Sequence, residues 1–285
     1  MGELLRKWSR TWVGCAVLGV VLPLVACDEA KDALLDQVGA NDERAALAVS
    51  SMQEGSLDTA ILVALTQGLT IEDDTAVMLG AVEAIARDVF TPASCLQTLV
   101  AQDTLTMTLD RCDAPFGVRA VRGALALRLP QSSLGNVLFS LSGAGLEING
   151  RTLVVNLTGS FEDGEDGRFW QLVTAGGGVS EARDPITRGG AFLAKVADDC
   201  VVMDGAWTLT VSETVYTLLF RSFQRCDNPC PTSGSVVFGE GEFELADGEI
   251  AADLGAITVT FVGSETVAWV DSERRGGVTT LTCAP

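Results

Sequence analysis

The fold class of this chain can be inferred from one stretch, Leu146-Glu147-Ile148-Asn149-Gly150-Arg151-Thr152-Leu153-Val154-Val155. Apolar and β-branched residues fill both halves, as is typical of β-strands. Asn149-Gly150 between them is the pair favoured in two-residue hairpin turns, where both central residues need positive φ angles. The sequence therefore predicts an antiparallel hairpin here.

Similar patterns recur from about residue 100 to the end of the chain. Thr, Val, Leu and Phe alternate with polar residues, and glycine marks the turns. Asp-Gly pairs at 166–167, 204–205 and 247–248 predict further turns, Gly263-Ser264 predicts another, and the glycine-rich stretch 175–178 predicts a loop. Many short strands with regular turns indicate an antiparallel sandwich, barrel or curved sheet. The predicted fold class is mainly β, with a small N-terminal α-helical region.

The helical region is predicted over residues 56–92, as two helices. Residues 57–68 follow a possible N-cap at Ser56 and end at Gly68. Residues 75–90 follow an N-cap at Asp74 and stop before Pro92. Residues 27–55 are acidic and rich in alanine, which predicts a tether merging into a helical start. Positions one or two turns apart in the second helix form one apolar stripe, predicted to pack on the sheet: Met78, Val82, Ile85 and Val89.

The N-terminus has the pattern of a secretory signal. Residues 1–11 are basic, and residues 12–26 are apolar and uncharged. The apolar run is shorter than the ~20 residues that span a bilayer. It ends in Leu24-Val25-Ala26-Cys27, which resembles the lipobox of bacterial lipoproteins. That resemblance implies cleavage between Ala26 and Cys27, removal of a signal peptide over 1–26, and acyl chains such as palmitate on the Cys27 thiol.

Two alternatives to the lipobox remain at this point. Residues 1–26 could be an ordinary signal peptide that leaves Cys27 for a disulfide, or an uncleaved helical anchor. The lipoprotein interpretation places the protein in the cell envelope, held on a membrane by its lipid. It leaves open the inner or the outer membrane, and which side of that membrane the protein faces.

Composition excludes several classes of function. The 285 residues carry a formal net charge of −19, which argues against nucleic-acid binding because phosphate recognition needs a basic face. The chain has no histidine, which removes His-based triads and His-metal sites. There is no G-x-S-x-G motif and no phosphate-binding loop. We therefore expect no enzymatic activity.

Six cysteines remain for disulfides once Cys15 and Cys27 are set aside: Cys95, Cys112, Cys200, Cys226, Cys230 and Cys283. An even number in an exported chain predicts three disulfides. A possible internal repeat, 95–195 and 200–285, narrows the pairing. Arg111-Cys112-Asp113-Ala114-Pro115 recurs as Arg225-Cys226-Asp227-Asn228-Pro229, and threonine-rich strands precede both.

The repeat predicts the pairs Cys95–Cys112 and Cys200–Cys226, which leaves Cys230–Cys283 to fix the C-terminal end. A second repeated motif is Arg188-Gly189-Gly190, which recurs as Arg275-Gly276-Gly277. Chance similarity between β-rich segments is the alternative explanation of the repeat. Zinc at Cys226 and Cys230 is a rival use of the cysteines, although no second cysteine pair has matching spacing.

Three groups of residues are candidates for chemistry. Glu162, Asp163, Glu165 and Asp166 form a weak Ca²⁺ candidate, because hard cations prefer clustered carboxylates; a solvated hairpin tip is the alternative. Asp198-Asp199 are adjacent, so on a strand they point to opposite faces and do not converge. Trp170, Trp207 and Trp269 are expected in the core, with a sugar-stacking face as the alternative.

These observations predict a lipid-anchored envelope lipoprotein, similar in character to uncharacterised lipoproteins of Gram-negative bacteria. The expected role is a binding or structural module with envelope proteins or glycans as partners. We expect no cofactor other than the lipid attached covalently to Cys27. The alternative is a carrier of lipid or lipoprotein with an apolar cavity between the helices and a curved sheet.

Overall fold

The computed structural model describes residues 25–130, 132–133, 135–165, 167–179, 185–228, 230–241 and 255–281, with the side chains of helix α2 described from Gly39 onward. Contacts divide the chain into two compact units, Met1–Ala40 and Asn41–Pro285. In the first unit the described part is helical backbone from Val25. The second unit contains the sheet, helix α3 and the rest of α2.

The second unit is built on one antiparallel sheet, which confirms the predicted fold class. Among the described residues each strand of the sheet pairs mainly with its neighbours in sequence, in the order β1-β2-β3-β5-β6-β7-β9-β10-β11-β12-β13-β14-β15, while β4 pairs with β5 and β8 with β6 and β9. The strands are β1 (Leu96–Ala101), β2 (Thr104–Ala114), β3 (Val118–Arg128), β4 (Ser132–Ser133), β5 (Asn136–Ile148), β6 (Arg151–Gly164), β7 (Gly167–Thr174), β8 (Gly177–Val179), β9 (Pro185–Ala197), β10 (Cys200–Val211), β11 (Thr214–Arg225), β12 (Ser233–Glu240), β13 (Ile257–Phe261), β14 (Thr266–Asp271) and β15 (Gly276–Thr280).

Local turn chemistry explains several of the hairpins. Asn149 and Gly150 have φ angles of 51° and 74° and join β5 to β6, as predicted. Gly263 joins β13 to β14, also as predicted. Gly164 pairs with Gly167 at the β6–β7 turn, where Asp166 lies outside the described residues.

Two glycine predictions are wrong, the second in part. Asp204-Gly205 is not a turn: it lies inside β10, at a register shift between Met203 and Gly205 where the strand bends. The loop predicted over 175–178 is wrong for Gly177 and Gly178, which belong to strand β8, while Ala175 and Gly176 lie outside the strands as predicted. The predicted turn at 247–248 lies outside the described residues.

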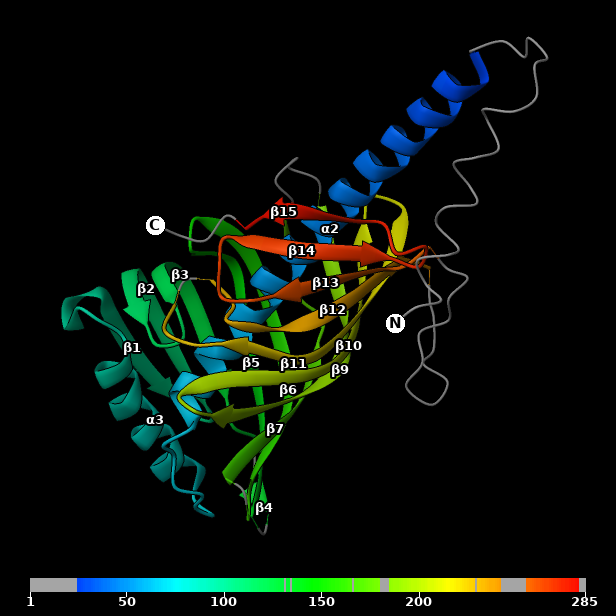
Figure 1. Cartoon of the computed structure of the whole chain (residues 1–285). Helices are drawn as coiled ribbons and strands as arrows, with labels where there is room; N and C mark the ends of the chain where they lie inside the picture. Colours follow the sequence, from blue (N-terminus) through cyan, green and yellow to red (C-terminus); the bar gives the residue numbers. More distant parts are fainter. Residues whose placement is uncertain are drawn as a thin grey trace. The chain divides into compact units, whose positions relative to one another are not determined.

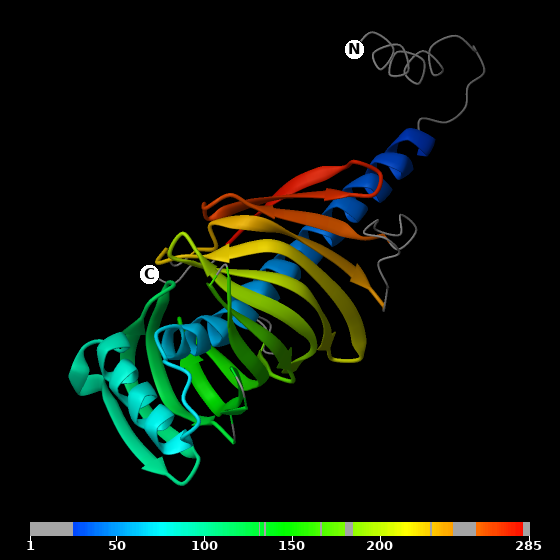
Figure 2. The same ribbon diagram turned by 90° about the horizontal axis from the view of Figure 1, so that it is seen from below.

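Helix α2 (Val25–Thr66) differs most from the prediction. It is one continuous helix through Gly39 and Gly55, so it does not begin at Ser56. The helical start predicted within 27–55 is present, but the tether is not, because residues 27–55 are helical throughout. From Ala48 to Thr66 every residue is buried. Figures 1 and 2 show the reason: the sheet curves around this part of the helix. A helix enclosed on all sides shows no apolar stripe, so its sequence lacks the usual helical periodicity.

Helix α3 (Thr75–Val89) confirms the clearest helix prediction. The Asp74 carboxylate accepts hydrogen bonds from the N–H groups of Ala76 and Val77, as an N-cap does. The helix packs against β1 and β2 and is followed by a short 3₁₀ turn, Ala93–Cys95. Its buried side chains are Met78, Leu79, Val82 and Ala86, of which Met78 and Val82 belong to the predicted stripe.

The structure contains two of the predicted disulfides, Cys95–Cys112 and Cys200–Cys226. Each joins the open end of one hairpin, β1–β2 or β10–β11. Cys230 is also disulfide-bonded, and the partner predicted for it, Cys283, lies outside the described residues. The threonine-rich stretches of the repeat do not correspond, because one lies in the second strand of its hairpin and the other in the first.

Candidate functional site

Three buried tryptophans hold α2 against the sheet. Trp170 on β7 donates its indole N–H to Thr66 Oγ1 at 3.0 Å, near the end of the helix. Trp269 on β14 donates to Asp42 Oδ1 at 2.6 Å. Trp207 on β10 lies between them, against Gly55. All three side chains are at most 2% exposed, so the prediction of core packing is confirmed and a sugar-stacking face is wrong.

Between these contacts lies a buried polar cluster, formed by two carboxylates of α2 and three arginines of the sheet. Glu54 and Asp58 are four residues apart, so they lie on the same face of the helix. Arg151 comes from β6, Arg188 from β9 and Arg225 from β11. The exposed side-chain fraction is 1% for Glu54 and for Arg188 and 14% for Arg151.

Glu54 is the better paired of the two carboxylates. Its Oε1 accepts a hydrogen bond from Arg151 Nη1 at 2.9 Å and another from Ser50 Oγ at 3.3 Å. Its Oε2 lies 3.9 Å from Arg188 Nη1. Asp58 Oδ1 accepts from the N–H of Thr59 at 2.7 Å, while Oδ2 lies 3.6 Å from Arg188 Nη2.

Burial shifts two pKa values in this cluster. Loss of water raises the pKa of Asp58 to about 6, against the lowering effects of Arg188 and of hydrogen bonds from Thr59. Loss of water also lowers the pKa of Arg225 to about 9, with repulsion from Arg119 adding to the effect. Because the cluster is enclosed by helix and sheet, a substrate has no access to it, and we infer that these charges act within the fold.

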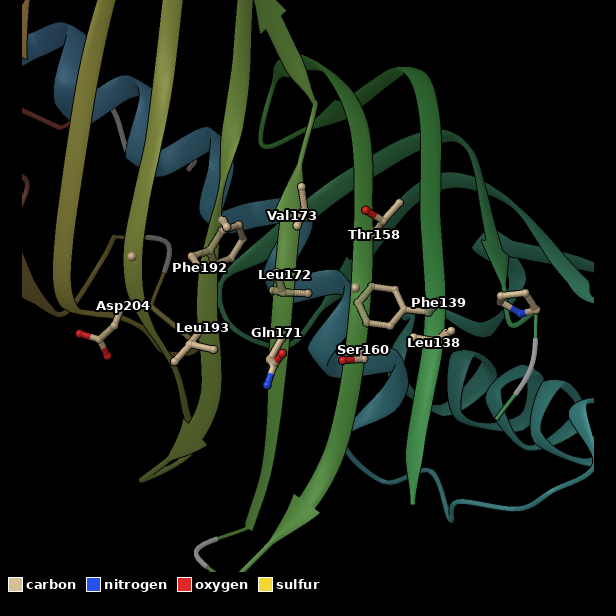
Figure 3. Close-up of a pocket in the computed structure, with 14 residues that line it drawn as sticks. Leu138, Phe139, Thr158, Ser160, Gln171, Leu172, Val173, Phe192, Leu193 and Asp204 are labelled. Atoms are coloured by element: carbon tan, nitrogen blue, oxygen red, sulfur yellow. The ribbon is translucent and has the colours of Figure 1, made fainter. Parts of the chain in front are cut away.

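The outward face of the sheet carries a groove of about 850 Å³ across β5, β6, β7, β9 and β10. Figure 3 shows Leu138, Ser160, Gln171 and Leu193 in a row on successive strands, with α2 on the opposite side. This order follows from the strand register, which pairs Leu138 with Ser160, Ser160 with Gln171, and Gln171 with Leu193. A second row, through Thr158, Val173 and Ala191, runs alongside.

The groove is apolar and almost free of charge. Leu138, Val173 and Leu193 are 50%, 51% and 53% exposed. Among the residues that line the groove, Asp204 is the one with a charged side chain, and its Oδ1 accepts a hydrogen bond from the N–H of Ser222. In a chain with 20% charged residues, this outward face is a neutral surface suited to apolar contacts.

Among the described residues, the carboxylates of the Ca²⁺ candidate are not brought together as a metal site. Asp163 is held by Arg168, whose Nε and Nη2 atoms lie 2.7 and 2.9 Å from its two oxygens. Hydrogen bonds from Arg168 lower the pKa of Asp163, against the effect of burial. Glu162 ends up in β6 and Glu165 in the following turn, while Asp166 lies outside the described residues. No cluster of three metal-ligating side chains occurs in the described part of the chain.

The remaining candidate residues fall into two groups. Asp198 and Asp199 form the exposed turn between β9 and β10, with φ angles of 50° and 58°, so they are not on a strand as assumed. Ala26 and Cys27 belong to the helical backbone of α2, and their side chains lie outside the described residues, as do residues 1–24.

Sequence reasoning missed both the polar cluster and the groove. The spacing of Glu54 and Asp58 was visible, but their burial was not, because it depends on sheet residues far along the chain, such as Arg151, which is 97 positions from Glu54. Arg188 was visible in the repeated Arg-Gly-Gly motif. The groove residues occupy alternate outward positions of strands whose pairing the sequence does not give.

Comparison of the chain with protein-family models, curated proteins and solved structures finds no match. Among the described helices, none combines the length and the apolar character needed to cross a membrane.

Proposed function

We propose that this protein is an exported, lipid-anchored envelope protein whose β domain binds a partner through the outward groove. The observation that supports this role best is the apolar groove around Leu138, Val173 and Leu193, with Asp204 as the one charged residue that lines it, on a chain with a net charge of −19. Exposed apolar patches rimmed by polar residues commonly serve as interaction sites. We propose no catalytic step.

The lipid anchor and export rest on two further observations. The lipobox-like Leu24-Val25-Ala26-Cys27 follows a basic and then an apolar segment, as in lipoprotein precursors. The disulfides Cys95–Cys112 and Cys200–Cys226 are of the kind that persists in oxidising compartments outside the cytosol.

A binding module is favoured over a lipid carrier by the position of α2. A carrier of this shape would use the inward face of the curved sheet for its cargo. Here Leu57, Ile61 and Leu65 of α2, all fully buried, fill that space.

The anchor and the groove are tested separately. Cys27→Ala should move the full-length protein from the membrane fraction to the soluble fraction and abolish labelling by palmitate; retention in the membrane would contradict the anchor. For the groove, a photo-crosslinking amino acid is placed at position 173 or 193 in cells. The matched control is position 278 on β15, where Val278 is 66% exposed on another part of the sheet.

We expect a discrete crosslinked product from positions 173 and 193, none from 278, and loss of that product when Leu138 is changed to Asp. Equal products from all three positions, or none from 173 and 193, would overturn the groove as the binding site. Leu138 is half exposed, so this substitution should leave the fold intact, which circular dichroism checks.

A further inference from the structure

The two buried carboxylates of α2, Glu54 and Asp58, are not equally well provided with hydrogen bonds and nearby cations by the sheet. Glu54 accepts a short hydrogen bond from Arg151. Asp58 Oδ2 accepts no hydrogen bond from any described residue, although Asp58 is only 1% exposed. Its nearest cation is Arg188 at 3.6 Å, beyond a good hydrogen-bond distance, and this arginine also lies between Asp58 and Glu54. Asp58 Oδ1 accepts from Thr59, so it is at Oδ2 that an ionised Asp58 lacks a hydrogen-bond donor.

The charged groups around Asp58 come from every element packed there. Arg188 of β9 is the cation that acts on Asp58 directly, and the other charged groups of the polar cluster are Glu54 on the same helix, Arg151 on β6 and Arg225 on β11. Arg151 is bonded to Glu54 and Ser50. Arg225 donates to Ser56 Oγ and to the carbonyl of Gly117. Arg188 is therefore the cation closest to Asp58, and it is shared.

We propose that Asp58 is a proton-dependent latch between α2 and the sheet, which holds the helix more tightly when its carboxyl group is protonated than when it is ionised. A neutral carboxyl group is accommodated in this enclosed site at low cost. An ionised one requires either full hydrogen bonding or water, and water enters only if the helix and the sheet separate locally. This inference does not depend on the proposed partner or on the lipid anchor.

The direction of the effect follows from proton linkage. Burial raises the pKa of Asp58 from 3.8 to about 6. A folded-state pKa above the unfolded value means that the folded state binds the proton more tightly, so the contribution is full at low pH and is lost as pH rises through about 6. Applied to pH 5 and pH 7.5, linkage gives about a tenfold increase in the opening equilibrium that exposes Asp58.

Amide hydrogen exchange of the full-length protein tests the latch. Protection of residues 51–66 is measured at pH 5 and at pH 7.5 and corrected for the pH dependence of intrinsic exchange. We expect wild-type protection to be about tenfold lower at pH 7.5, and Asp58→Asn to show the same protection at both values. The matched control is Asp42→Asn in the same helix, where the remaining amide oxygen can still accept from Trp269; it should keep the tenfold change.

Equal wild-type protection at the two pH values, or an unchanged tenfold difference in Asp58→Asn, would overturn the latch. If Asp58→Asn does not fold, titration of the wild-type protein decides instead. With ¹³C-carboxyl-labelled aspartate, the resonance of Asp58 should titrate with a midpoint near 6. A midpoint at or below 3.8 for every aspartate would contradict the proposal.

Discussion

The indole ring of Trp207 lies so close to Gly55 that a Cβ atom on residue 55 would stand 2.7 Å from Trp207 Cη2. Real Cβ atoms do not approach other heavy atoms this closely, so the helix and β10 can meet here only with glycine in the helix. Arg188 Nη1 would lie 3.3 Å from the same Cβ atom. Gly55 therefore sets how closely α2 and the polar cluster pack against the sheet.

Gly55→Ala should destabilise the protein although alanine is the better helix former. Alanine gains about 1 kcal/mol of helix propensity, whereas forcing an extra methyl group into a packed core costs about 1–3 kcal/mol in general and more where a rigid ring is in the way. We expect a net loss of about 1–2 kcal/mol in the free energy of unfolding, measured with urea.

The matched control is Gly80→Ala in α3. Gly80 is exposed in the middle of that helix, and a Cβ atom there would meet nothing within 4 Å. The propensity gain is then unopposed, and stability should rise by about 0.5–1 kcal/mol. If the free energy of unfolding changes in the same direction in both variants, then Trp207 does not exclude a side chain at position 55.

The sequence was informative where a structure depends on local chemistry. Asn149-Gly150 predicts its hairpin and Asp74 its helix start, because each acts on backbone groups within a few residues. It was misleading for α2, because Gly55 and the surrounding polar residues look like breaks in a helix, and only the enclosing sheet accounts for them. Asp204-Gly205 was misread for a similar reason, since a bend inside a strand uses the same residues as a turn.

The repeated Arg-Gly-Gly motif has a structural explanation that the sequence alone could not supply. Gly190 on β9 pairs with Trp207 on β10, and Gly277 on β15 pairs with Trp269 on β14. A Cβ atom at either glycine would lie within 2.7 Å of the paired tryptophan. At Gly277 the glycine makes room for the Trp269 indole, and at Gly190 it makes room for the backbone and Cβ of Trp207.

Glu54→Ala should be one of the most destabilising single changes in this chain. It removes the carboxylate that accepts from Arg151 at 2.9 Å and that lies beside Arg188, and breaking a buried ion pair from one side typically costs about 3–5 kcal/mol. Glu83→Ala on α3 is the control, because its partner Arg87 is 57% exposed; its cost should stay below about 1 kcal/mol. Similar urea midpoints for the two variants would argue against a structural role for the buried cluster.

Removing either disulfide should lower the free energy of unfolding, because the unfolded chain gains conformational entropy when the cross-link is absent. Cys95 and Cys112 are 17 residues apart, and Cys200 and Cys226 are 26 apart. The chain-entropy model gives about 3 kcal/mol for each, with the longer loop slightly larger. The serine double variants Cys95→Ser/Cys112→Ser and Cys200→Ser/Cys226→Ser, compared in urea, check this. A loss well below 1 kcal/mol in either variant would mean that its hairpin stays closed without the bond.

Asp271 should stabilise the protein at neutral pH and lose this contribution in acid, opposite in sign to Asp58. Burial opposes ionisation of Asp271, but hydrogen bonds from the Arg275 side chain and from the N–H groups of Arg275 and Glu273 outweigh it, so its pKa lies below the usual 3.8. A lowered folded-state pKa contributes stability above about pH 4, which is lost as pH falls through the folded-state value. Its carboxylate also accepts from Asn41 Nδ2 at 3.1 Å, which ties β14 to α2.

Asp271→Asn keeps the shape of the side chain and removes its charge. We expect it to lower the free energy of unfolding at pH 7 by about 1–3 kcal/mol, because the charge-assisted bond from Arg275 is lost. The difference from wild type should shrink as pH is lowered toward 2, since wild-type Asp271 then becomes neutral too. Urea denaturation at pH 7, 4 and 2.5 measures this, and a difference that stays constant over that range would show that the charge of Asp271 contributes nothing.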